Sequence, residues 1–226
     1  MPYLESANDY RVHFQGIENQ ELLQLIKSAS QLSYLQDNPP KTSTALRRRA
    51  EGDIPNIESA LQSQGYYSSR VEFNINFNIT PNVVTILIDP GEVYFFGNVT
   101  ILPKSLNIAI DKLEIPIGKA ALPRHIVKAE NFLTQLLAEK GYPLASLENR
   151  QVIADDEQNL IHVTFSINPG PLISFGETLI TGQAVVEESV IRNKICWKEG
   201  DLYDSEKVEQ TIIALESSRL FSSINI

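Results

Sequence analysis

The feature that most constrains the fold is an internal repeat. Helical spacing of apolar residues stops at Gly65 in "LQSQGYYSSRVEFNINF" (61–77), and strict alternation of apolar and polar residues begins directly after it. The same change follows Gly141 in "LAEKGYPLASLENR" (137–150), 76 positions later. "LESSRLFSSINI" (215–226) has the same form, with Arg-Leu where the other two have Gly-Tyr. Self-similarity at a fixed period indicates tandem structural units.

A second marker has nearly the same period. Pro-Gly precedes an apolar strand containing Phe-Gly in "DPGEVYFFGNVTI" (89–101) and in "NPGPLISFGETLI" (168–180), and Gly170 follows Gly91 by 79 positions. Two independent markers therefore predict three units of somewhat under 80 residues. We place them at residues 8–91, 92–170 and 171–226.

The first unit predicts the order β-α-α-β-β. Its segments are a strand over 10–17, a helix over 19–30, a second helix over 46–61 and strands over 70–79 and 83–88. Gly52 and Pro55 interrupt the second helix, and proline is tolerated only in a first helical turn. We therefore expect a break near Asp53, which would cap the second piece. Gly65 is expected to end the helix in the left-handed region.

The other two units repeat this order more loosely. The second has a strand over 93–102, a short helix over 106–113, a long helix ending at Gly141, and a hairpin of 144–153 with 160–167. The third has a strand over 172–182, helices over 185–195 and near Val208, Ile212 and Leu215, and a strand over 221–226. The predicted fold class is α+β, with three tandem β-α-α-β-β domains, the third lacking its last strand. That missing strand suggests a fragment of a longer protein.

Composition excludes several classes of protein. The net charge is −9, which argues against nucleic-acid binding because phosphate contacts require clustered Lys and Arg. No apolar stretch reaches the roughly 18–20 residues of a membrane-spanning helix. The N-terminus also lacks the pattern of a signal peptide, so the chain is either cytosolic or an exported protein whose signal has been removed. Cys196 is the single cysteine, so no intrachain disulfide is possible.

No catalytic, metal or cofactor site is expected. His13, His125 and His162 fall in segments far apart in the sequence. The acidic stretch "ADDEQN" (154–159) lacks the ligand spacing of an EF-hand and is interpreted as a hairpin turn, and "KEGD" (198–201) as another turn. A small hydrolase with Cys196 as its nucleophile is the alternative from a different class of function.

The order and size of these units resemble the POTRA (polypeptide-transport-associated) domains that precede outer-membrane β-barrels. "LRRRAEGDIPNIESALQSQGYYSSRVEFNI" (46–75) and "WKEGDLYDSEKVEQTIIALESSRLFSSINI" (197–226) resemble the first and third POTRA domains of the TamA family within the BamA superfamily. The resemblance implies a periplasmic protein tethered to the outer membrane by its own C-terminal β-barrel, absent here. It implies client outer-membrane proteins, autotransporters among them, and a TamB-like inner-membrane-anchored partner. Alternatives are the POTRA region of a two-partner secretion transporter or of a BamA-type insertase.

A small sheet with helices on one face has open edges, to which an extended partner can add a strand. In POTRA domains the second strand is the usual exposed edge, which implies the segments 70–79, 146–153 and 222–226 here. The candidate partner-binding residues are Val71, Glu72, Phe73, Asn74, Ile75, Asn76, Ser146, Leu147, Glu148, Asn149, Ser222, Ser223 and Ile224. Gly65, Tyr66, Gly141 and Tyr142 are expected to be structural corner residues. An inert, solvated surface is the alternative for the asparagine-rich strand 70–79.

Overall fold

The computed structural model describes residues 9–183 and 185–226, so the expected start of the first domain at residue 8 lies outside the described residues. The chain divides into two compact units. The first contains the described residues up to Val99, with Ile115–Ile126 and Val152–His162. The second contains Thr100–Glu114, Val127–Gln151 and Val163–Ile226. No helix in the described part of the chain is long and apolar enough to cross a membrane.

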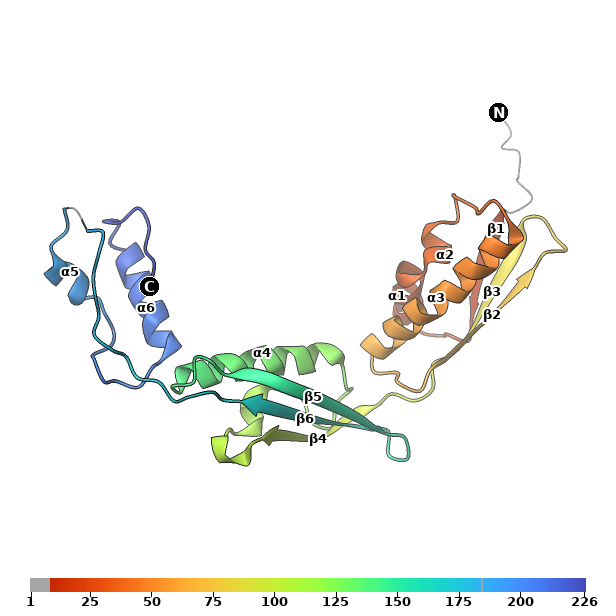
Figure 1. The fold of residues 1–226 in the computed structure, drawn as a ribbon. Coiled ribbons are helices and arrows are strands. Elements are labelled where there is room, and N and C mark those ends of the chain that lie inside the picture. Colours follow the sequence, from red (N-terminus) through yellow and green to blue (C-terminus); the bar gives the residue numbers. More distant parts are fainter. Residues whose placement is uncertain (1–8, 184) are drawn as a thin grey trace. The chain divides into compact units, whose positions relative to one another are not determined.

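The first sheet has three strands in the order β1-β3-β2 (Figure 1). Strand β1 (Tyr10–Gln15) runs parallel to β3 (Asn82–Asp89), and β2 (Arg70–Asn76) runs antiparallel to β3. The last strand in sequence is therefore the central one. Strand β2 pairs through β3 alone, and its other side is an edge of the sheet.

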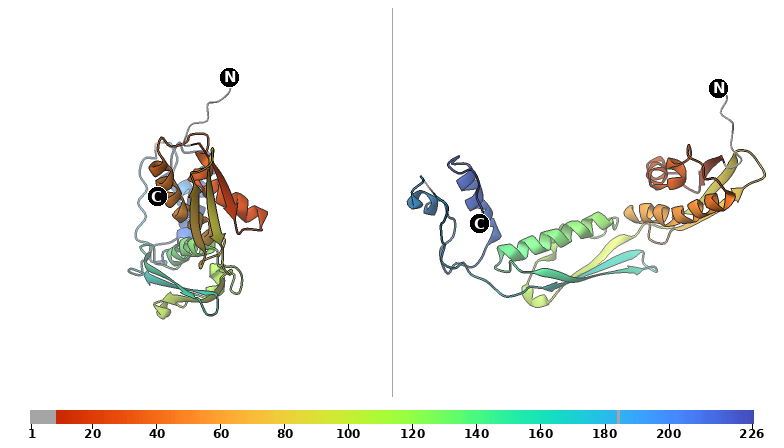
Figure 2. Two further views of the ribbon diagram at one scale, coloured as in Figure 1. Left: turned by 90° about the vertical axis from the view of Figure 1, so that its right-hand side faces the viewer. Right: turned by 45° about the horizontal axis from the view of Figure 1, so that its top comes forward.

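Three helices lie between β1 and β2 in the sequence. They are α1 (Gln20–Ala29), α2 (Gln31–Tyr34) and α3 (Ser43–Ser63), and α3 packs on α1, α2 and β2 (Figure 2). Asn19, Ser30 and Thr42 cap them, each side chain accepting a backbone N–H of the first turn. The buried core comprises Tyr10, Leu22, Ile26, Leu32, Leu46, Ala50, Ile57, Leu61, Val71, Val84, Ile86 and Ile88. The predicted order of strands and of the two long helices is confirmed, and the short helix α2 is an addition to it.

The expected break near Asp53 is wrong, because α3 runs through Pro55 without interruption. Asp53 is fully buried and caps a different helix. Its carboxylate accepts the Ser30 hydroxyl at 2.5 Å, the Gln31 backbone N–H at 2.6 Å and the Leu32 backbone N–H at 3.3 Å. The gain from satisfying the buried N-terminus of α2 compensates for the hydrogen bond that Pro55 cannot make.

The second sheet has the order β4-β6-β5. Its strands are β4 (Phe95–Leu102), β5 (Ser146–Asp155) and β6 (Leu160–Asn168). Helix α4 (Pro123–Glu139) precedes the β5–β6 hairpin. The apolar face predicted for this helix is confirmed by the burial of Ile126, Ala129, Leu133, Leu136 and Leu137. The second sheet thus repeats the strand order of the first, again with the last strand in the centre.

The short helix predicted over 106–113 is replaced by two 3₁₀ turns, Lys104–Leu106 and Ile110–Leu113. Each turn ends at a residue with positive φ, Asn107 at 46° and Glu114 at 53°. A segment this short forms too few hydrogen bonds to extend into an α-helix, since helix nucleation is costly. Leu113 is nevertheless buried, so the segment still contributes an apolar side chain.

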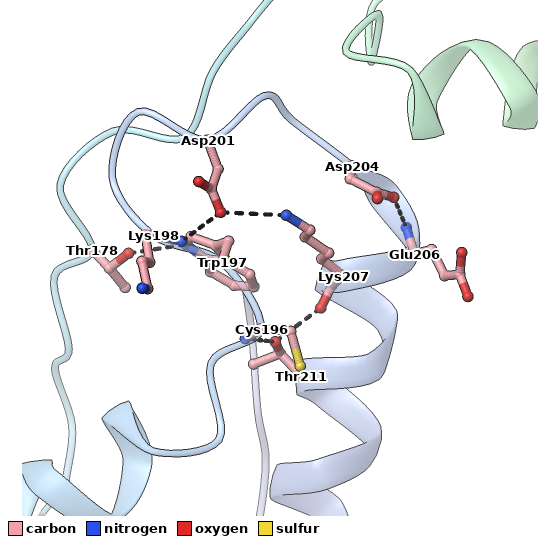
Figure 3. Close-up of polar contacts among 9 residues, drawn as sticks. All are labelled: Thr178, Cys196, Trp197, Lys198, Asp201, Asp204, Glu206, Lys207 and Thr211. Atoms are coloured by element: carbon pink, nitrogen blue, oxygen red, sulfur yellow. Dashed lines mark hydrogen bonds and ion pairs between the residues drawn. The ribbon is translucent and has the colours of Figure 1, made fainter.

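Residues from 171 onward form two helices, α5 (Glu188–Arg192) and α6 (Ser205–Glu216). Figure 3 shows how the loop before α6 is fastened to it. Thr211 accepts the Cys196 backbone N–H at 3.0 Å, and Asp201 accepts the Lys207 ammonium at 3.3 Å. Asp201 also accepts the Lys198 backbone N–H, which closes the predicted "KEGD" turn. These two bonds, the Lys198 one first, lower the pKa of Asp201.

An aromatic cluster fills the centre of this segment. The Phe175 ring stacks on Trp197 with centroids 4.7 Å apart and lies 5.1 Å from the Tyr203 ring. The Trp197 indole N–H donates to the Thr178 hydroxyl at 3.0 Å (Figure 3). The indole is therefore satisfied while its rings are stacked, as buried tryptophans require.

The strands predicted over 172–182 and 221–226 do not form, apart from one antiparallel bridge between Ser174 and Leu202. The strand order of the first sheet explains why these strands do not form. In the first sheet both outer strands pair only with the central, last strand. No strand follows α6 among the described residues, so neither predicted strand has the partner that β3 and β6 provide.

Candidate partner-binding edges

Strand β2 is an edge of the first sheet with one buried and one wet face. Val71 is buried and Phe73 and Ile75 are half-buried, whereas Glu72, Asn74 and Asn76 are exposed. This alternation was predicted. Phe77 and Ile79 were expected to continue the inward face, but they are 38% and 47% exposed. The strand ends before them, because the Asn76 side chain accepts the Asn78 backbone N–H at 2.9 Å and turns the chain.

Strand β5 is an edge of the second sheet and is exposed over almost its whole length. Ser146, Glu148 and Asn149 are exposed and Leu147 is half-buried. Farther along, the adjacent residues Val152 and Ile153 are 41% and 49% exposed, so both faces of the strand carry uncovered aliphatic side chains. A ten-residue edge strand with so little burial leaves a long row of backbone groups accessible.

The third predicted edge, Ser222–Ile226, is not a strand in the structure. Ser222 and Ser223 are exposed and Ile224 is half-buried. Arg219, at the position that Gly65 and Gly141 occupy in the other repeats, also has positive φ, at 56°. The helix-ending conformation is thus kept without the glycine, and the following strand is what is lost.

The segment after α3 forms a joint with the start of the next repeat. Gly65 has φ +92°, and the Tyr66 N–H returns to the Leu61 carbonyl at 3.1 Å, which ends the helix in a Schellman motif. The Gly65 carbonyl then accepts the Tyr94 N–H at 2.9 Å. The Tyr67 hydroxyl donates to the Ala121 carbonyl at 2.7 Å, and its ring meets Tyr94 edge-on. Tyr66 packs against the first core.

A second joint repeats these backbone bonds. Gly141 also has φ +92°, Tyr142 N–H returns to Leu137, and the Gly141 carbonyl accepts the Ile173 N–H at 2.9 Å. Four further backbone hydrogen bonds join the start of a repeat to a short segment that follows it in the sequence. They are Ala121 to Tyr94 and Phe96 to Lys119 in the first joint, and Tyr203 to Ile173 and Phe175 to Asp201 in the second. The two joints are therefore built from equivalent residues.

Comparison with known proteins identifies these repeats. Residues 173–226 match the family model described as "POTRA: Surface antigen variable number repeat". The chain also shares its fold with the crystal structure of Haemophilus influenzae BamA POTRA3-5, at a TM-score of 0.51 and 21% identity, over 95% of this chain and 86% of that one. Residues 173–226 thus match the POTRA family, and the chain has the fold of POTRA domains. The predicted fold class is confirmed with this match.

The chain is also similar to two further proteins. Outer membrane protein assembly factor BamA of Buchnera aphidicola subsp. Acyrthosiphon pisum (strain APS) is 24% identical over 227 residues, which cover 94% of this chain. The chain spans 35% of that relative's length. POTRA1-3 of the periplasmic domain of Omp85 from Anabaena matches at a TM-score of 0.43 and 18% identity, over 96% of this chain and 86% of that one.

His125, His162 and the acidic turn have structural partners. The His162 imidazole Nδ1 accepts the Asn98 backbone N–H at 2.9 Å, and His125 lies edge-on to Phe96. In the 154–159 turn the Asp155 carboxylate accepts the backbone N–H groups of Glu157 and Gln158. Within residues 9–183 and 185–226, no three His, Cys, Asp or Glu side chains are grouped as metal ligands would be.

We predict that Tyr94 ionises late in an alkaline titration. Its buried hydroxyl donates to the Asp156 carboxylate at 2.7 Å, and this bond, with burial, raises the pKa of Tyr94. The neutral phenol is the folded form, so its contribution to stability is complete below pH about 10 and is lost as pH rises through the raised pKa. Tyrosinate absorbance should show a late phase that Tyr94→Phe reduces and Asp156→Asn shifts to lower pH. An unchanged late phase in both variants would contradict the assignment.

Proposed function

We propose that this chain is the periplasmic POTRA region of an outer-membrane protein assembly factor of the Omp85/BamA superfamily, and that it binds client and partner proteins. The proposed domains are residues 8–91, 92–170 and 171–226. The observation that carries the proposal is the pair of exposed edge strands β2 and β5, in a chain that has the fold of POTRA domains. The relative named as an outer membrane protein assembly factor supports the superfamily.

Strand addition suits this role because main-chain bonds form with almost any extended sequence. A factor that handles many clients needs that tolerance. Strand β5 offers the longer edge, and its exposed Val152 and Ile153 can contact alternate side chains of an added strand. Strand β2 offers a shorter edge with amide side chains at Asn74 and Asn76, which is the better candidate for a polar partner.

Within the superfamily, the TamA type is the finer proposal. It rests on the resemblance of 46–75 and 197–226 to TamA, and it requires a TamB-like partner. The BamA type is the alternative, since the named relatives are BamA proteins. Recovery of a TamB-like protein after cross-linking through β2 or β5 favours the first type, and recovery of outer-membrane clients alone favours the second.

We also propose that the chain is a scaffold and not an enzyme. The Cys196 thiol is exposed and lies against the Lys194 carbonyl, with no imidazole among its hydrogen-bond partners. A thiol nucleophile needs a base within hydrogen-bond reach. Cys196→Ser is therefore expected to leave partner binding unchanged.

The strand-addition proposal is tested by two adjacent proline variants in β5, Glu148→Pro and Asn149→Pro. Neighbouring residues of a strand direct their N–H groups to opposite sides, so one variant removes a bond of the β5–β6 ladder and the other removes a donor on the free edge. Both side chains are exposed, so little packing is lost in either. We expect the edge variant to keep its melting temperature within a few degrees while binding of an alternating aliphatic–polar strand peptide falls at least about tenfold.

The ladder variant serves as the matched control, since it should unfold more easily. Strand addition at β5 fails if the variant with native stability binds the peptide as well as the unsubstituted chain does. The same pair design applies to β2 at Asn74 and Ile75, where the Ile75 variant also loses packing because that side chain is half-buried.

A further inference from the structure

The second joint carries three exposed leucines, which we call the leucine patch: Leu144, Leu172 and Leu202. Their side chains come from three separate segments and are 64%, 59% and 45% exposed. Terminal methyl groups of Leu172 and Leu202 approach the same point, 2.8 and 2.7 Å from where a Cβ on Gly141 would lie. Leu144 lies against Gly170, two residues before Leu172. A Cβ at position 141 would displace both leucine side chains.

The first joint is an internal reference for this patch. Gly91 approaches Ser68 there as Gly170 approaches Leu144, and Gly65 approaches Val93 as Gly141 approaches Leu172. The bridges Phe95–Ala120 and Ser174–Leu202 are likewise equivalent. The positions of Leu144, Leu172 and Leu202 in the second joint are therefore occupied by Ser68, Val93 and Ala120 in the first. The same backbone is stable without the leucines, so the joint itself does not require them.

The charge around the patch also differs between the joints. The segment 116–124, "PIGKAALPR", contains two cations and no acid, whereas the equivalent 198–206, "KEGDLYDSE", contains one lysine and four acids. Leu202 lies in the middle of this acidic segment. Glu199 and Glu206 are exposed there. Asp201 is paired with Lys207, so the exposed acids on either side of Leu202 in the sequence are Glu199 and Glu206. An aliphatic side chain with acidic neighbours is complementary to an apolar side chain with cationic neighbours.

We propose that the leucine patch binds an extended segment of a partner protein in which an aliphatic side chain is flanked by Lys or Arg. This inference rests on the proposed role of the chain as a binding module and adds a side-chain preference to it. The aliphatic residue fills the space between Leu144, Leu172 and Leu202, and its basic neighbours meet Glu199 and Glu206. Strand β5 begins at Ser146, so a segment held at the patch is next to that edge.

The test uses the isotope-labelled chain and a synthetic peptide of alternating leucine and lysine. The expected result is a set of amide shift changes centred on residues 141–145, 171–173 and 201–203. The variant Leu144→Ser with Leu172→Val and Leu202→Ala gives the second joint the residues of the first. We expect it to weaken this binding at least about tenfold. Glu199→Gln with Glu206→Gln should weaken it about threefold at low salt and have little effect at high salt.

Two control peptides complete the design, one with glutamate for lysine and one with serine for leucine, and neither should bind at the patch. Equal binding of the glutamate peptide, or of the triple variant, overturns the proposal. Self-association of the chain that the triple variant abolishes also overturns it, because a second copy would then be the occupant. Should the triple variant fold poorly, the single variant Leu144→Ser is used in its place, because this side chain is 64% exposed. The β5 proline variant keeps the patch intact, so failure of strand addition is distinguished from failure at the patch.

Discussion

Replacement of Asp53 by alanine is expected to destabilise the first sheet and its helices by about 3–5 kcal/mol. The carboxylate is fully buried and accepts four donors: the Ser30 hydroxyl, the backbone N–H groups of Gln31 and Leu32, and, at 3.4 Å, the Asn56 side-chain amide. Alanine leaves these donors without an acceptor in a site that water does not reach. Because domains of this size are stable by only about 5–15 kcal/mol, the variant should unfold at much lower urea concentration.

Glu51→Ala is the matched control for this measurement. Glu51 is an exposed acid of the same helix, two residues earlier, and its removal should change the free energy of unfolding by less than about 0.5 kcal/mol. A loss below about 1 kcal/mol for Asp53→Ala would show that α2 does not depend on this carboxylate.

Replacement of Gly16 by alanine is expected to destabilise the first sheet by about 3 kcal/mol or more. Gly16 has φ +93°, a conformation that costs roughly 1–2 kcal/mol for other residues. An added Cβ would also lie within van der Waals overlap of the Ile88 carbonyl oxygen and 3.0 Å from its carbon. The obstacle is the backbone of the central strand, so it cannot rotate away, and the β1–β3 pairing has to shift.

Gly52→Ala gives the opposite sign and is the control for Gly16. Gly52 lies inside α3, and a Cβ there meets no atom within 4 Å. Alanine should stabilise the chain by about 0.5–1 kcal/mol through helix propensity. Chemical denaturation of both variants measures the difference, and destabilisation by both would place the cause outside the close approach at Ile88.

The repeat and its element order could be predicted from sequence because each depends on local patterns. The glycines after α3 and α4 and the strict alternation in β2 are signals within a few residues of one another. The period between Gly91 and Gly170 then set the size of the unit. These signals do not depend on how distant segments pack.

The predictions that were wrong concern features that depend on contacts between residues far apart in the sequence. Proline 55 was expected to break α3, and only the packing of Asp53 against the start of α2, 21 to 23 residues away, explains why the helix continues. The strands of the third unit were predicted from their own sequences, but a strand needs a partner, and the central one is supplied by the last segment of each repeat.

The candidate edges were found by resemblance, whereas the leucine patch was not found at all. A signal for it did exist in the sequence. Aligning Gly118 with Gly200 sets "PIGKAALPR" beside "KEGDLYDSE" and reveals both the leucine and the reversal of charge. The spacing between this pair differs from that of the helix-ending glycines, so the equivalence became visible only through the shared hydrogen bonds.

We propose that partner strands add to the free edges of β2 and β5. Strand addition is tested by amide hydrogen exchange of the chain, alone and with a denatured outer-membrane β-barrel protein diluted from urea. We expect exchange to slow at alternate residues of Ser146–Asp155 and Arg70–Asn76, because half of the N–H groups of an edge strand point outward. Exchange in α3 and α4 should not change. Binding of the client with slower exchange confined to the helices, or with none in either strand, would show that the edges are not where the client binds.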